Sequence, residues 1–199
     1  MSAELPRELM GLSKSVRASI GGLAAAGFLL YTSSALEALG PATPERIPTT
    51  TAAALDGRTV VLPRDLDGGV TVLILGFGRN SGDTTTAWEK PIRKSLAGPG
   101  IGFFDMPVLA EVPGFVRPFV LRAIRHKVPD VLKPNFVPVT ESEADWKRVA
   151  GFDQKQPDAA YVLLVDRSGT VQWTTHEAYS ADRFQAMAAE ARKLAAGER

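Results

Sequence analysis

Side chains that carry covalent or metal chemistry are scarce in this 199-residue chain, which has no cysteine and two histidines, His126 and His176. Without a thiol, the sequence excludes disulfides, thiol redox exchange, thiolate zinc sites and iron–sulfur clusters together. Two histidines cannot form a three-histidine metal centre, and no serine stands in the Gly-x-Ser-x-Gly pattern of a hydrolase nucleophile. The sequence therefore predicts no catalytic residue, no metal and no cofactor.

One loop nevertheless combines a cation, polar side chains and glycines between an apolar run and a helical pattern. A helix start leaves backbone N–H groups unpaired, so this loop could bind a small molecule or a peptide. The candidate ligand-binding residues are Arg79, Asn80, Ser81, Asp83 and Trp88. The plainer interpretation is an ordinary helix start capped by Ser81 or Asp83. A phosphate-binding loop is not expected, because the glycine spacing does not match and Asp83 stands where a lysine is needed.

An enzymatic alternative would require a carboxylate with a strongly perturbed pKa in a pocket near Asp83. The sequence shows no second group placed to work with such an acid. We therefore expect the protein not to be an enzyme.

Basic residues concentrate in a single segment, which also contains His126. The candidate basic face consists of Arg117, Arg122, Arg125 and Lys127. Such a face could contact acidic lipid headgroups or an acidic partner beside a membrane, and the alternative is a solvated helix face. Over the whole chain, 23 Lys and Arg residues oppose 22 Asp and Glu residues. This balance argues against nucleic acid as a partner.

The N-terminal residues 1–38 are typical of a signal or anchor segment. Lys14 and Arg17 precede an apolar stretch over 18–31, which is short for a membrane span and suits the apolar part of a signal peptide. A retained helix would hold the protein at a membrane, whereas cleavage would release it to the periplasm or outside the cell. Residues 39–54, rich in Pro, Thr and Ala, are predicted to form an extended linker.

The remaining residues, 55–199, are predicted to form one mixed α/β domain with a central sheet. Asp56 and Gly57 mark a hairpin turn, and the nearly all-apolar run 70–75 predicts a strand that is buried on both faces. Further strands are expected at 100–109, 135–139, 161–165 and 170–173. Helices are expected at 84–96, 115–127, 141–149 and 181–196, the last capped by Ser180. The tryptophans Trp88, Trp146 and Trp173 are expected in the core or at its edge.

The order of these elements resembles the thioredoxin plan with an added N-terminal hairpin, as in redoxins. Residues 161–173 (YVLLVDRSGTVQW) resemble the strand–turn–strand signature of that superfamily. The tryptophan that ends this hairpin, and the segment 119–129 (FVLRAIRHKVP), resemble the family of the mitochondrial F-type ATP synthase assembly factor. The resemblance implies a thioredoxin-like three-layer fold without its thiol. It also implies a role in building the membrane sector of ATP synthase.

Two functional hypotheses follow. The first is a non-catalytic, membrane-associated assembly factor or chaperone, whose partner is a membrane or a membrane-protein client such as an ATP synthase subunit. The second is a periplasmic redoxin-like module that binds a ligand or peptide at the loop described above, without redox activity.

Overall fold

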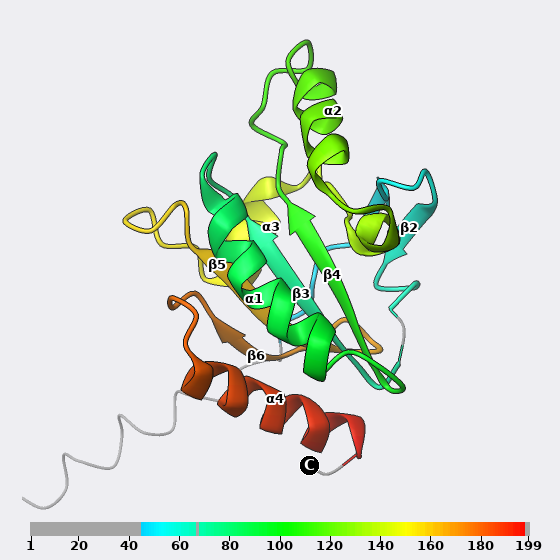
Figure 1. Cartoon of the computed structure of the whole chain (residues 1–199), viewed down its shortest axis with the longest axis vertical. Helices are drawn as coiled ribbons and strands as arrows, with labels where there is room; N and C mark the ends of the chain where they lie inside the picture. The colour runs from blue at the N-terminus through cyan, green and yellow to red at the C-terminus, as the bar shows by residue number, and fades with distance from the viewer. Residues whose placement is uncertain (1–44, 67, 198–199) are drawn as a thin grey trace, which may run out of the picture. The chain divides into compact units, whose positions relative to one another are not determined.

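A four-stranded mixed sheet forms the centre of the protein (Figure 1). The computed structural model describes residues 45–66 and 68–197. The strands, in spatial order, are β4 (Ile101–Pro107), β3 (Val70–Gly76), β5 (Ala160–Asp166) and β6 (Val171–Thr175). β3 is parallel to β4 and antiparallel to β5, and β5 is antiparallel to β6. This is the mixed central sheet that the sequence predicts.

The two faces of the sheet are covered by different elements, which gives three layers. Helices α1 (Ser81–Ser95) and α4 (Ala181–Ala195) pack on one face. Helix α3 (Glu143–Ala150) and the hairpin β1–β2 pack on the other. Along β3 the side chains alternate between these layers, with Val72 and Ile74 toward α1 and Leu73 and Leu75 toward α3. The strand is therefore apolar at every central position because both of its faces are covered.

The turn between β5 and β6 is fixed by one acidic side chain. The Asp166 carboxylate accepts hydrogen bonds from the backbone N–H groups of Ser168 (2.8 Å) and Thr170 (3.0 Å). Gly169 takes the positive φ of 78° that the turn requires. These contacts lower the pKa of Asp166, because they favour its charged form against the opposing effect of burial.

The predicted hairpin turn at 55–58 is present, but its first strand lies inside the predicted linker. β1 (Thr50–Ala53) pairs antiparallel with β2 (Thr59–Leu62), and Ile47 and Ala54 are buried. The prolines and threonines of 45–54 therefore do not make this part of the chain a free spacer. The buried apolar side chains of Ile47 and Ala54 contribute to holding it against the core.

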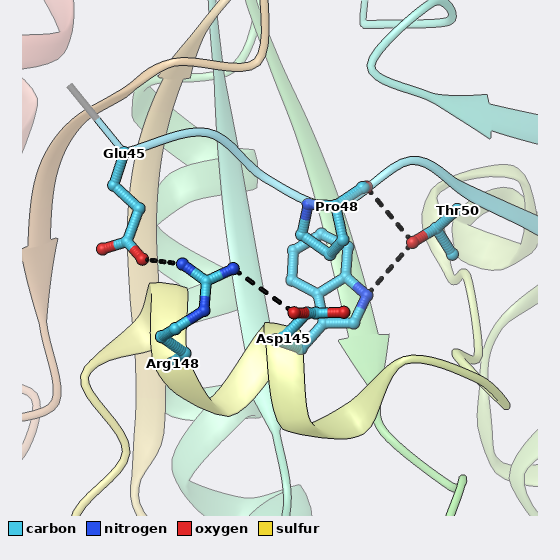
Figure 2. A network of polar contacts seen from close by, with 6 residues as sticks. Glu45, Pro48, Thr50, Asp145 and Arg148 are labelled. Atoms are coloured by element: carbon cyan, nitrogen blue, oxygen red, sulfur yellow. Dashed lines mark hydrogen bonds and ion pairs between the residues drawn. The ribbon is translucent and has the colours of Figure 1, made fainter. Parts of the chain in front are cut away.

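Polar contacts fasten the same segment to α3 (Figure 2). The buried indole of Trp146 donates to the Thr50 hydroxyl at 3.2 Å, and that hydroxyl donates to the Pro48 carbonyl at 3.3 Å. Arg148 forms ion pairs with Glu45 and Asp145. The Val171 N–H also donates to the Glu45 carbonyl at 2.8 Å. The folded domain therefore begins before residue 55.

The strand expected at 135–139 is reduced to two isolated bridges beside β4, at Phe136 and Val139. The N–H groups of Val137 and Val139 donate to the carbonyls of Asp105 and Pro107. A return bond from residue 107 is impossible because proline has no N–H. The segment is buried alongside the sheet but does not form a continuous ladder.

The four expected helices are present, with shifted ends. α4 begins after Ser180, whose hydroxyl accepts from the Arg183 N–H as expected of an N-cap, and it buries Phe184, Met187, Ala188 and Ala191. α3 begins at Glu143. α2 (Arg117–Lys127) is followed by the short 3-10 helix η1 (Asp130–Asn135). Trp88 and Trp146 are buried and Trp173 is half-buried, as expected of core and core-edge residues.

No helix within 45–66 and 68–197 has the length and apolar character needed to cross a membrane. The predicted signal or anchor segment, residues 1–38, lies outside the described residues, as do residues 39–44 of the predicted linker.

Candidate functional site

The candidate ligand-binding loop lies where β3 ends and α1 begins. Asn80 is the residue before the first turn of α1, and its side chain makes no capping bond within the helix. The expected caps, Ser81 and Asp83, are both inside the helix. Ser81 is buried, and its hydroxyl donates to the Gly78 carbonyl at 2.8 Å. The helix start is therefore not capped by a local side chain.

The cap comes instead from a distant residue, Asp158, in the loop before β5. Its carboxylate accepts from the Asn80 N–H at 3.0 Å and from the Asn80 side-chain amide at 3.2 Å. The Asp158 carbonyl accepts from the Thr84 hydroxyl at 2.7 Å. A carboxylate is the natural partner for the positive end of a helix. A carboxylate of the chain itself therefore bonds the backbone at the helix N-terminus, where an anionic ligand could otherwise bind.

The two loops are also pressed together at Gly78. A Cβ atom there would overlap the Asp158 carboxylate and lie 2.5 Å from the Pro157 carbonyl oxygen. Only glycine allows this close approach. The contact leaves no room for a ligand between Gly78 and the 157–158 segment.

The five predicted ligand-binding residues divide into three groups in the structure. Arg79 and Asp83 are exposed at the helix start, while Asn80 is exposed but bonded to Asp158. Ser81 points inward. Trp88 lies in the core beneath α1, with its indole ring edge-on to Tyr179 at a centroid distance of 5.5 Å. The indole N–H has no hydrogen-bond partner among the described residues. The loop and Trp88 thus do not form one binding surface.

An aromatic cluster packs against the loop 152–158, which carries Asp158. The ring of Phe77 meets those of Phe152 (5.1 Å) and Tyr161 (5.3 Å) edge-on, and His176 stacks on Tyr161 at 5.4 Å. The Tyr161 hydroxyl accepts from the Asp153 N–H at 3.0 Å, and the Gln156 carbonyl lies 3.0 Å from it. Burial is the main cause that raises the pKa of Tyr161. This cluster fixes the loop 152–158, and hence the position of Asp158.

A buried carboxyl lies on the inner side of α1, in the layer between that helix and β4. Asp105 is 5% exposed, and Glu89 on α1, which is paired with Arg93 at 2.8 Å, is also buried. Burial, and next the negative charge of Glu89, raise the pKa of Asp105 to about 7. The two acids belong to the packed core and not to the loop at Asp83 where an enzymatic alternative would need them.

No group of three or more potential metal ligands is present among residues 45–66 and 68–197. His126 is exposed on α2, whereas His176 is half-buried against Tyr161 at the end of β6. The two histidines thus belong to different elements.

The predicted basic face lies on α2, with one exception. Arg122, Arg125 and Lys127 are exposed. Arg117 is half-buried, and its guanidinium donates to the carbonyls of Ala110 (3.2 Å) and Val112 (3.1 Å). Arg117 therefore holds the preceding loop in place and does not belong to the exposed face.

Sequence reasoning missed two residues that decide the character of these regions, Asp158 and Asp105. Asp158 follows Pro157 in a polar loop, and nothing local connects it with a helix start 78 positions earlier. Asp105 was visible as the one charged residue inside an apolar strand pattern, Phe103-Phe104-Asp105-Met106. An acid at such a position is expected to be buried and to have a raised pKa.

No protein-family model matches the chain, and no curated protein matches it. Solved structures do match. An exposed lipoprotein thioredoxin of Streptococcus pneumoniae superposes with a TM-score of 0.53 at 11% identity, covering 72% of this chain and 99% of that one. BsSco, a member of the Sco family of cytochrome c oxidase assembly proteins, gives 0.50 at 14% identity, covering 76% and 94%.

Copper-bound Sco1 of yeast gives a TM-score of 0.50 at 13% identity, covering 79% of this chain and all of that one. Likeness at such low identity shows the fold alone. The chain accordingly has a thioredoxin-like α/β fold, with a four-stranded mixed sheet and an antiparallel hairpin, as the sequence predicts.

Proposed function

We propose that the protein is a non-catalytic, membrane-associated assembly factor or chaperone that acts by binding a client. The observation that carries this proposal is the closed start of α1. In this fold the helix N-terminus is suited to stabilising a thiolate. Here the chain has no cysteine, and the carboxylate of Asp158 bonds the Asn80 N–H at that place. A thioredoxin-like domain without thiol chemistry retains its surfaces, and these can bind other molecules.

The membrane part of the proposal is supported by the sequence of residues 1–38 and by the exposed cations of α2. A membrane-protein client is the partner that such a location would supply. The sequence resemblance described above makes the membrane sector of ATP synthase the first client to test. The Sco likeness adds that an assembly role occurs on this fold, in that family.

The alternative is a periplasmic module that binds a ligand or peptide at the start of α1. It has less support, because Asp158 and the close contact at Gly78 occupy the place of the ligand. A melting-temperature screen with small anions and peptides distinguishes the two functions. Stabilisation of the wild-type protein by one of them would favour the binding module.

The proposal is tested with the tagged full-length protein in its native host. After crosslinking and fractionation, we expect recovery in the membrane fraction together with a membrane-protein subunit. Deletion of the gene should lower the amount of the assembled complex that contains that subunit. Recovery as a soluble, shortened species without a partner would contradict the proposal. If only ATP synthase assembly is unaffected by the deletion, that client is wrong.

A complementation experiment tests the non-catalytic part. Asp105→Asn removes the buried acid whose pKa is raised to about 7 and replaces it with a side chain of the same shape. We expect this variant to restore assembly as well as the wild-type protein does, and the matched surface variant Asp145→Asn to do the same. Loss of function in a folded Asp105→Asn protein alone would indicate acid–base chemistry.

A further inference from the structure

Helix α2 differs from the other α-helices of the described chain because none of its residues is buried. Arg117 and residues 120, 121 and 124 are half-buried. The other residues of the helix are exposed. In Figure 1 the helix projects past the carboxyl end of β4, at the opposite end of the sheet from α4. It is thus a convex feature and not part of a packed layer.

Large apolar side chains are exposed at this projection. Phe115, in the loop before α2, is 80% exposed, and Phe119 in its first turn is 73% exposed. Val131, four residues after the helix, is 77% exposed. These are three of the four large exposed apolar side chains in the described residues. All three lie within residues 115–131, in the loop before α2, in α2 and in η1, and such a group of exposed apolar side chains is expected of an interaction surface.

The charge at the projection is entirely positive. The sequence from 112 to 129 contains no acidic residue. Arg122, Arg125 and Lys127 are exposed and have no ion pair within the described residues, and they follow Phe119 along the helix, Arg122 about one turn after it. The nearest acids in the sequence on either side, Glu111 and Asp130, are each paired with a lysine. The cations of α2 are therefore not neutralised by an ion pair within the described residues.

The loop that carries Phe115 is held in position by Arg117. Its guanidinium bonds to the carbonyls of Ala110 and Val112. The aromatic side chain is therefore presented from a fixed turn.

We propose that α2 and the preceding loop, residues 115–127, dock on an anionic lipid bilayer. Phe115 and Phe119 enter the interfacial region, and Arg122, Arg125 and Lys127 lie among the headgroups. Charge complementarity selects this occupant, because exposed aromatic side chains at the start of a helix, followed by three cations without an ion pair in the described residues, match a negative surface that contains an apolar layer. A bilayer also accepts a convex, isolated helix, whereas a protein partner would need a groove shaped to it. The inference refines the proposed membrane association, but the local readout below tests it separately.

The test uses full-length protein that carries Phe119→Trp, mixed with vesicles whose acyl chains are brominated and quench nearby tryptophan. Trp88 and Trp146 are buried and Trp173 is half-buried, so the wild-type protein, which has these three tryptophans alone, is measured in parallel and its quenching is subtracted. The signal comes from α2 itself, so attachment through residues 1–38 cannot produce it. Vesicles of phosphatidylcholine alone are compared with a mixture that contains phosphatidylglycerol. The control Gln185→Trp places the probe on the exposed side of α4.

We expect quenching of Phe119→Trp on the anionic vesicles and none of Gln185→Trp. Adding Arg122→Glu with Arg125→Glu should weaken the apparent vesicle affinity about tenfold or more, since each lost headgroup contact and each new repulsion acts in the same direction. The same charge change at Lys90 and Lys94, two exposed and unpaired cations on α1, should have little effect. Circular dichroism should show every variant folded.

Three outcomes would overturn the inference. One is the absence of quenching on anionic vesicles. Another is quenching that is equally strong on neutral vesicles and unchanged when Arg122 and Arg125 are replaced by Glu, which would show that these cations do not bind anionic headgroups. The third is the finding that an acidic protein binds over the Phe119→Trp probe while the brominated lipids do not quench it. Because fractionation of the same variants reports membrane association as a whole, failure of this inference and failure of the proposed function can be told apart.

Discussion

The start of α1 and the whole of α2 are two polar regions of the same domain, and they differ in what completes them. At α1, a carboxylate from a loop 78 residues away bonds the helix N-terminus, and Gly78 lets the two loops touch. At α2, the cations have no counter-charge in the described chain, and two phenylalanines are exposed. In the first region, the hydrogen-bond partner of the helix start comes from the protein itself. In the second, the cations and the phenylalanines have no such partner in the described chain, and we propose that a membrane provides it.

The comparison separates a helix start that is bonded from within the domain from a helix that packs little on it. At the start of α1, hydrogen bonds to Asp158 tie two distant loops together. In α2 no residue is buried. The two regions are therefore expected to respond differently to substitution.

The largest change in stability is predicted for a substitution of Asp105, in the layer beneath α1. Its pKa is about 7 in the folded protein against 3.8 as the ordinary value. Between these values the folded state holds a proton that the unfolded state has lost, so stability falls as pH rises through this window and levels off above it. Asp105→Asn should remove the loss and stabilise the protein at pH 8 by up to about 4 kcal/mol, with little effect at acidic pH.

Chemical denaturation at several pH values measures this effect. Glu89 and Arg93 are retained in the variant, so the ion pair between them is present in both proteins and the difference reports Asp105 together with its repulsion by Glu89. If the free energy of unfolding depends on pH in the same way in Asp105→Asn and in the wild-type protein, then Asp105 is charged in the folded protein and water reaches the layer under α1.

An intermediate effect is predicted for glycines in the two regions. Gly78→Ala should destabilise the domain by about 2–3 kcal/mol, because its methyl group meets the Pro157 carbonyl oxygen at 2.5 Å. Gly114→Ala, in the loop before α2, meets nothing within 4 Å. Its effect should stay within about 1 kcal/mol and can be stabilising. If both variants lower the free energy of unfolding equally in thermal unfolding, the loop at Gly78 is no more tightly packed than the loop before α2.

The smallest effect is predicted for α2 itself. Phe119→Ser should change the free energy of unfolding by less than about 0.5 kcal/mol, since the side chain is 73% exposed. Ile92→Ala on α1, where the side chain is fully buried, should cost about 2–5 kcal/mol. A large loss of stability from Phe119→Ser would mean that α2 packs on the domain, and the proposed docking surface would have to be abandoned.

The layers of this fold could be predicted from the sequence because they depend on local patterns. The apolar run at 70–75, the turn at Asp166 and the stripe on α4 each specify an element within a few residues. The folding of residues 45–54, part of the predicted linker, could not be predicted from local patterns. Their burial depends on Trp146 and Arg148, which are about 100 positions away.

The candidate site was harder to predict for the same reason. Residues 79–83 were located correctly at a helix start, but the partner that closes it, Asp158, comes from a distant loop. The exposed cations Arg122, Arg125 and Lys127 could be found by composition alone. Arg117 belongs to the same sequence cluster, yet only the structure shows it bonded to backbone carbonyls.

The contact between Asp158 and Asn80 also bears on what would be needed to engineer a reactive thiol at this helix start. A single substitution that placed a cysteine at Ser81 would bring a thiol near a carboxylate that already bonds the neighbouring N–H, and that negative charge would disfavour a thiolate. Removing Asp158 alone would take away the bond to the Asn80 N–H and leave the helix start without a reactive group. A designed thiol at this place would thus require at least two substitutions made together.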